Sequence, residues 1–178
     1  MKNTQMANLR CQSGVTLIEA LALIIGGIVV LAAVALGVFK LFTASEISTE
    51  ASNITQISTN LKNLKDGTNG YRDLDTKTAI AFHVFPLNMA QSPAGTVSNS
   101  WGGAVSVDQA PGNSDHYILS YKGVPQEACQ QLALKLRSAD WVGLTIGGAR
   151  IDKSSSISDI QSVCKFQANG NDFAFEGT

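Results

Sequence analysis

Few side chains in this sequence have a type and a position that could do chemistry, and the most conspicuous is Glu19. It lies just before a run from Ala20 to Phe39 that contains no charged residue and no proline. As a helix, this run is long enough to cross the hydrocarbon core of a bilayer. A carboxylate inside the membrane is costly and is therefore a functional candidate, whereas a carboxylate at the interface would belong to an ordinary membrane anchor. Both interpretations are open on hydropathy alone.

Motifs of the common enzyme classes are missing from the sequence. It contains no G-x-S-x-G, H-E-x-x-H, P-loop or G-x-G-x-x-G pattern, and the polar run Ser154-Ser155-Ser156 has no identifiable base. The cysteines and histidines match no zinc spacing. The net charge of −1 gives no basic footprint for nucleic acid. We therefore expect no enzymatic activity, no catalytic residue, no cofactor, no metal and no nucleic-acid partner.

The residues that precede the apolar run change its interpretation. Residues 1–14 are polar and basic, without an acidic residue, and they lack the apolar core and cleavage site of a secretory signal. This leader ends in Gly14 and is followed by Val15-Thr16-Leu17-Ile18-Glu19, a pattern that resembles the type IV prepilin signature. The resemblance implies cleavage after Gly14, N-methylation of Val15 as the first mature residue, and a role for Glu19 in subunit assembly. Valine in place of phenylalanine at the first mature position favours the type IVb branch.

The cysteines extend the resemblance to the other end of the chain. Cys11 lies in the predicted leader, so Cys129 and Cys164 remain in a chain that the leader directs out of the cytoplasm, where a disulfide is the expected state. Two free buried thiols are the alternative. Residues 126–132 and 160–165 are similar to the cysteine-bearing segments of type IVb pilins of the PilS-like, toxin-coregulated and bundle-forming types.

The elements that must position these residues follow from periodicity. Residues 15 to about 66 are predicted as one long helix, which becomes amphipathic after Phe42. The apolar stripe of this second half consists of Ile47, Ala51, Ile54, Ile57, Leu61 and Leu64. The other faces are expected to carry Glu46, Glu50, Asn53, Asn60 and Lys62. The second half of the helix therefore needs a packing partner on one side only.

Beyond this helix the sequence predicts a sheet with short helices. Residues 79–85 fit either a strand or a helical turn, and residues 91–99 are predicted as loop because Ser, Pro, Gly and Thr dominate. Strands are predicted at 101–107, 116–121, 141–146 and 173–175, with an antiparallel hairpin formed by the first two. A helix is predicted at 126–137, and a short helix with capping-box spacing begins at Ser158.

Together these features predict an α+β chain with the type IV pilin fold, in which a long N-terminal helix packs on an antiparallel sheet with a disulfide-closed C-terminal region. The expected parts are a leader at 1–14, a hydrophobic transmembrane and polymerisation helix at 15–42, and a globular domain at 43–178. The globular domain is expected to divide into the amphipathic half of the helix at 43–66, a connecting loop at 67–100, and the sheet and disulfide region at 101–178.

The resemblance implies the function of a major pilin of a type IVb pilus. Subunits would leave the inner membrane of a Gram-negative bacterium and polymerise through their N-terminal helices into an extracellular filament for adhesion, aggregation or conjugation. The implied partners are other copies of the chain in a helical homopolymer, a prepilin peptidase, the pilus assembly platform in the inner membrane, and a receptor on a host or recipient cell. A minor pilin or a type II secretion pseudopilin is the alternative, and a monomeric membrane-anchored extracytoplasmic binding domain is a further one.

Overall fold

The structure is a computed structural model that describes residues 16–65, 67–92 and 94–178, with only the backbone at residue 30 and residues 32–42. Gly14 and Val15, the predicted cleavage site, lie outside the described residues. The chain divides into two compact units, Met1–Phe42 and Thr43–Thr178.

A single helix, α1 (Leu17–Leu64), contributes to both units. It confirms the prediction of one long helix as far as the described residues reach. No proline interrupts it, and alanine and leucine, which favour helix, are frequent. In the second unit four members of the predicted apolar stripe are buried, Ile47, Ile54, Ile57 and Leu61, and Ala51 and Leu64 are partly buried against the same core.

Two polar residues of α1 contradict the predicted pattern. Glu50 and Asn53 are predicted on the outward faces of the helix, but their side chains are only 1% and 4% exposed. Both side chains can be buried because they are hydrogen-bonded within the second unit, the globular unit: Glu50 to Asn53 and Tyr121, and Asn53 also to Asn88.

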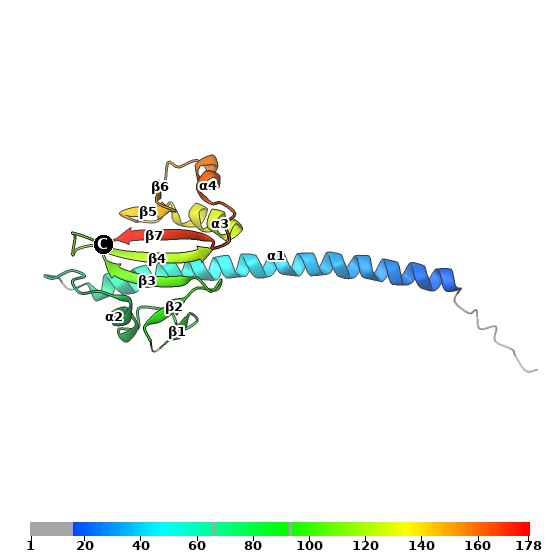
Figure 1. Ribbon diagram of the computed structural model, residues 1–178, viewed down its shortest axis with the longest axis horizontal. Helices are drawn as coiled ribbons and strands as arrows, with labels where there is room; N and C mark the ends of the chain where they lie inside the picture. The colour runs from blue at the N-terminus through cyan, green and yellow to red at the C-terminus, as the bar shows by residue number, and fades with distance from the viewer. Residues whose placement is uncertain (1–15, 66, 93) are drawn as a thin grey trace, which may run out of the picture. The chain divides into compact units, whose positions relative to one another are not determined.

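The remaining elements form a sheet with three short helices (Figure 1). In chain order they are α2 (Thr76–Ala81), β1 (Ala90–Ser92), β2 (Thr96–Ser98), β3 (Ala104–Gln109), β4 (Tyr117–Val124), α3 (Gln126–Leu136), β5 (Gly143–Ile146), β6 (Ala149–Ile151), α4 (Ile157–Val163) and β7 (Asn171–Gly177). The strands pair in the order β1-β2-β3-β4-β7-β5-β6, and every pairing is antiparallel. The last strand of the chain therefore lies between β4 and β5.

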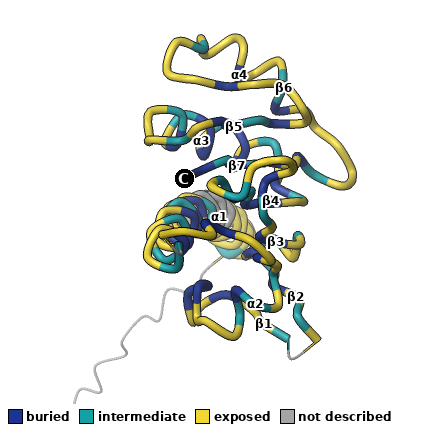
Figure 2. Tube along the Cα trace, turned by 90° about the vertical axis from the view of Figure 1, so that its left-hand side faces the viewer, coloured by how far each residue is buried: buried dark blue, intermediate teal, exposed yellow. Residues whose placement is uncertain are grey.

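One face of this sheet supplies much of the core. Buried and half-exposed positions alternate along β4 from Tyr117, as expected for a strand with one face against the core. Leu119 on this strand lies opposite Val107 on β3 and Phe175 on β7. Figures 1 and 2 show residues 43–64 of α1 and the helix α3 along the same face of the sheet. The predicted hairpin and the predicted last strand are thus confirmed.

The prediction is wrong at the edges of the sheet. Residues 91–99, predicted as loop, contain most of a hairpin of β1 and β2, in which Gln91 lies opposite Val97. The strand β6 is not predicted at all, and it pairs with β5 after a turn at Gly147 and Gly148. Such short strands gain their order from the backbone of a partner strand, and a local sequence pattern does not contain that information.

The start of the first predicted strand also differs from the prediction. The strand β3 begins at Ala104 instead of Trp101, because Gly102 has a positive φ of 78° and a Cβ on Gly103 would overlap the backbone carbonyl of Lys122. The two glycines form a tight turn before the strand.

The helices α2 and α4 decide the structure of residues 79–85 and of the segment predicted to begin at Ser158. Residues 79–85 contain the end of α2, whose N-cap Asp75 accepts a hydrogen bond from the N–H of Thr78 at 2.7 Å. The capping box of α4 joins Ser156 and Asp159, so it begins two residues before the predicted Ser158.

Candidate functional site

Glu19 lies in the first turn of α1, where it forms a local hydrogen-bonded box with Thr16. Its Oε2 accepts hydrogen bonds from the backbone N–H and the hydroxyl of Thr16, both at 3.0 Å. In return the N–H of Glu19 donates to Thr16 Oγ1 at 3.4 Å. This reciprocal pattern is a capping box, and the negative charge is favourable at the helix N-terminus. Oε1 accepts no hydrogen bond from the described residues, so one carboxylate oxygen remains for a partner.

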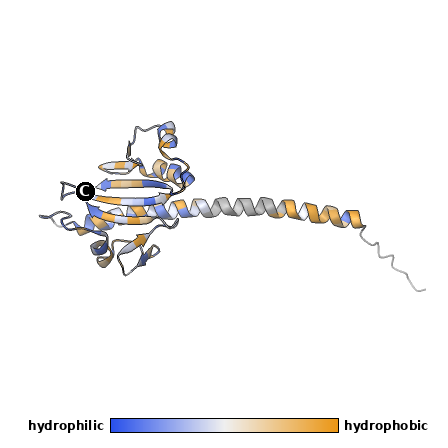
Figure 3. Cartoon of the chain, viewed as in Figure 1, coloured by the Kyte–Doolittle hydropathy of each residue, from blue (hydrophilic) through white to orange (hydrophobic). Residues whose placement is uncertain are grey.

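The apolar side chains around Glu19 are exposed on every face of the helix. Leu17 is 90% exposed and Ile18 is 75% exposed. The other large apolar residues exposed in this unit are Leu21, Leu23, Ile24, Ile25, Ile28, Val29 and Leu31, in the stretch of α1 that is coloured as hydrophobic in Figure 3. An apolar surface of this extent marks a contact surface for protein or lipid.

The predicted transmembrane segment at 15–42 is described only in part. Its side chains at residue 30 and residues 32–42 lie outside the described set. Among the parts of the chain that the structure describes, no helix is both long and apolar enough to cross a membrane.

The cysteine region is closed by the predicted pair. Cys129 and Cys164 form a disulfide with their Cα atoms 5.7 Å apart, and both side chains are fully buried. The bridge joins the buried face of α3 to the end of α4. Asn171 at the start of β7 supports this closure, because its side chain accepts the N–H of Lys165 at 3.0 Å and donates to the carbonyl of Val124 at 3.1 Å.

A second polar cluster holds α1 to the sheet, and the sequence analysis did not predict it. The buried carboxylate of Glu50 accepts the N–H of Ser100 at 2.7 Å and its hydroxyl at 2.5 Å. The other oxygen accepts the hydroxyl of Tyr121 at 2.9 Å and the amide of Asn53 at 3.3 Å. Burial, followed by the nearby charge of Glu50, raises the pKa of Tyr121, so this hydroxyl remains a donor. We call these residues the Glu50 network.

The signal for this network was present in the sequence. Glu50 is three residues after Ile47 and four before Ile54, which is the spacing of the apolar stripe itself. A carboxylate on a buried stripe requires hydrogen-bond donors from elsewhere in the fold. Those donors lie 50 and 71 residues further along the chain, so the sequence could indicate the need but not the partners.

Comparison with known proteins identifies this arrangement of helix, sheet and disulfide. The family model described as PilS N terminal matches residues 44–174, which is most of the chain. The chain belongs to the PilS family. The predicted resemblance to the type IVb pilins is therefore confirmed. Members of the pilin family are structural subunits and not enzymes.

Two solved structures are similar to this pilin. The crystal structure of type IV b pilin from Salmonella typhi matches with 24% sequence identity and a TM-score of 0.57, and the match covers 72% of this chain and 97% of that chain. The NMR structure of type IVb pilin (PilS) from Salmonella typhi matches with 24% identity and a TM-score of 0.47, covering 73% of this chain and 94% of that chain. The search of curated proteins found no match. At this level of identity, the crystal structure supports the fold alone.

The predicted site residues fall into separate parts of this pilin. The structure brings Cys129 and Cys164 together in the second unit, whereas Glu19 belongs to the first. The family match starts at residue 44 and does not include Gly14, Val15 or Glu19. The assignments of cleavage, methylation and assembly to these residues therefore stay predictions.

Proposed function

We propose that this pilin is the major structural subunit of a type IVb pilus and polymerises through the N-terminal part of α1. The observation that carries the proposal is the row of exposed apolar side chains from Leu17 to Leu31, with Glu19 as the carboxylate among them. Removing one such side chain from water contributes about 1.5–3 kcal/mol. A chain with this many exposed apolar groups needs either lipid or copies of itself around them.

Transfer from lipid into a filament requires a determinant of register. Lipid tails are as apolar as leucine, so the apolar side chains gain little when they exchange lipid for neighbouring helices. A buried charge, by contrast, is costly when unpaired and tolerable when paired. The free Oε1 of Glu19 would meet the amine of Val15 from a neighbouring subunit. Every register that leaves this pair unmade would be penalised.

This mechanism implies a defined sequence of partners. A prepilin peptidase would remove residues 1–14 after Gly14 and methylate Val15, and an assembly platform in the inner membrane would then add the subunit to the filament. The hydrophobic segment at 15–42 would hold the subunit in the inner membrane before assembly. The globular domain at 43–178 would face outward, with its disulfide region at the surface of the pilus and available to a host-cell or recipient-cell receptor.

The proposal is tested by substituting Glu19 and separating processing from assembly. Glu19→Ala should permit leader cleavage and formation of the Cys129–Cys164 bridge, but filament yield should fall steeply. Glu19→Asp should be partly defective, because its carboxylate falls about one methylene short of the neighbouring amine. The measurement compares processed pilin in membranes with pilin in sheared filaments. Glu46→Ala, an exposed glutamate of the same helix, is the control.

Two results would contradict the proposal. Wild-type filament yield from Glu19→Ala would show that apolar packing alone sets the register. N-terminal sequencing that finds residues 1–14 retained in filaments would refute the cleavage site. The abundance of the chain in sheared filaments separates a major pilin from a minor one, because a major pilin dominates the filament mass.

A further inference from the structure

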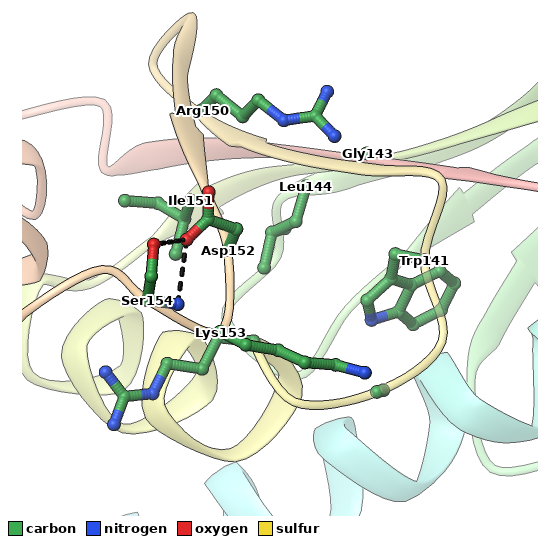
Figure 4. A pocket seen from close by; sticks show the side chains of 10 residues that line it. Trp141, Gly143, Leu144, Arg150, Ile151, Asp152, Lys153 and Ser154 are labelled. Atoms are coloured by element: carbon green, nitrogen blue, oxygen red, sulfur yellow. Dashed lines mark hydrogen bonds between the residues drawn. The ribbon is translucent and has the colours of Figure 1, made fainter.

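A cavity of about 330 Å³ lies beside the strands β5 and β6 (Figure 4). It has no role in the proposed assembly or in the closure of the disulfide. It is lined by β5, β6, the end of α3 and residues 152–154. We call it the basic cavity, because Arg137, Arg150 and Lys153 contribute to its wall together with a single acid, Asp152. Its volume has room for one small ring-shaped ligand.

The cations of the basic cavity lack an ion-pair partner among the described residues. The guanidinium of Arg137 donates to the carbonyl of Ser155, and that of Arg150 donates to the carbonyl of Val142 at 2.8 Å. These neutral acceptors orient the two side chains without cancelling their charge. Among the described residues, His116 and Glu176 are the acidic and basic side chains that approach within 4 Å of each other. Arg137, Arg150 and Lys153 therefore form no ion pair within this part of the chain. The carboxylate of Glu176 lies near Arg150, because a Cβ on Gly143 would be 3.3 Å from Glu176 Oε2 and 3.5 Å from an Arg150 guanidinium nitrogen. Lys153 is therefore the cation that an anion in the cavity would use.

Asp152 makes the cavity more selective than a simple anion site. Its Oδ1 accepts the N–H groups of Ser154 and Ser155 at 2.8 and 3.1 Å. Hydrogen bonds from the side chain and backbone of Ser154 lower the pKa of Asp152, so the carboxylate stays ionised. Its Oδ2 accepts no hydrogen bond from the described residues. A ligand that carries hydroxyl donors as well as a negative charge would use this oxygen.

The floor of the cavity is apolar and held in place. The indole N–H of Trp141 donates to the carbonyl of Leu136 at 3.1 Å, and its ring packs on Phe175 with centroids 4.9 Å apart. Figure 4 shows Trp141, Leu144 and Asp152 around the same space, with the long side chain of Lys153 along one edge. A half-buried indole offers an apolar surface to the face of a ring.

We propose that the basic cavity binds an acidic sugar unit, a hydroxyl-bearing ring with one carboxylate. The carboxylate would lie against Lys153, a hydroxyl would donate to Asp152, and the C–H face of the ring would pack on Trp141. A fatty acid would leave Asp152 facing apolar groups, and an inorganic anion would not use the indole. The site is present in a single chain, so this inference does not require that the chain assembles into a filament.

The test uses the full-length chain in detergent with Trp101→Phe, which leaves Trp141 as the fluorescent reporter because the sequence has two tryptophans. Glucuronate should change the fluorescence with a saturable dependence, whereas glucose and acetate should not in the same range. Lys153→Gln should weaken glucuronate binding roughly tenfold, the loss expected for one charge-assisted hydrogen bond. Lys122→Gln, an exposed lysine outside the cavity, should leave the affinity unchanged. Added salt should weaken binding.

Several outcomes would overturn the inference. Absence of a saturable response to glucuronate would refute the site, and an equal response to acetate would reduce it to an adventitious ion only. Equal affinities in Lys153→Gln and Lys122→Gln would exclude the cavity as the binding place.

Discussion

Glu50→Ala should destabilise the globular unit strongly, although Glu50 belongs to a different unit from the proposed assembly residue Glu19. The substitution removes the acceptor for the N–H of Ser100 and the hydroxyl of Tyr121, at 2.7 and 2.9 Å. A hydrogen bond to a charged group contributes about 1.5–3 kcal/mol. Losing these two would therefore lower the free energy of unfolding by about 3–6 kcal/mol. For a unit of this size we expect a fall in the melting temperature on the order of 10 °C.

Two further variants separate charge, shape and position on the helix. Glu50→Gln keeps the size of the side chain and one acceptor oxygen, but its new amide meets the amide of Asn53, and two donors then face each other. The hydroxyl of Tyr121 can rotate to accept, so the expected loss is smaller, about 1–2 kcal/mol. Glu46→Ala removes an exposed carboxylate from the same helix and should change stability by no more than about 0.5 kcal/mol.

The assay is thermal unfolding of the full-length chain in mild detergent with the disulfide intact, followed by near-ultraviolet circular dichroism. This signal reports the packing of aromatic side chains such as Tyr121. If Glu50→Ala melted together with Glu46→Ala, the Glu50 network would contribute nothing and its burial would have to be explained otherwise. If Glu50→Gln matched the wild type, neither the charge nor the donor facing Asn53 would matter to stability.

Three further predictions concern the core. Cys129→Ser should lower the free energy of unfolding by about 4 kcal/mol in the chain-entropy model, because the bridge spans a separation of 35 residues; an unchanged thermal midpoint would contradict this. Tyr71→Phe should leave stability unchanged or raise it, because among the described residues its buried hydroxyl has no partner, whereas Tyr117→Phe loses a 2.7 Å hydrogen bond and should cost about 1 kcal/mol; equal losses would refute the distinction. Burial raises the pKa of all three tyrosines, that of Tyr71 to about 12, while unfolded phenols titrate near pH 10. Because the folded pKa is the higher one, this contribution to stability is present below about pH 10 and is lost as the pH rises toward about 12; phenolate absorbance appearing near pH 10 in the intact fold would contradict it.

Local sequence patterns determined the elements with strong periodicity. The half of α1 after Phe42, the helix α3 and the strands β3, β4 and β7 each alternate apolar and polar residues with the period of their structure, so one segment suffices to predict each. The cysteine pair followed from the count of cysteines and the predicted destination of the chain. The turn at Gly102 and Gly103, in contrast, needed the neighbouring backbone of Lys122 to explain where β3 begins.

The tertiary structure alone decided the features that depend on partners distant in the sequence. The hairpin of β1 and β2 and the strand β6 are too short and too polar to predict, and they are strands because a neighbouring backbone offers hydrogen bonds. Glu50 is buried because Ser100 and Tyr121 supply its donors. The basic cavity combines the end of α3 with the turn after β6, two segments whose charges are unremarkable separately. Hydrogen-bond satisfaction and charge pairing are properties of the folded arrangement, and no local pattern contains them.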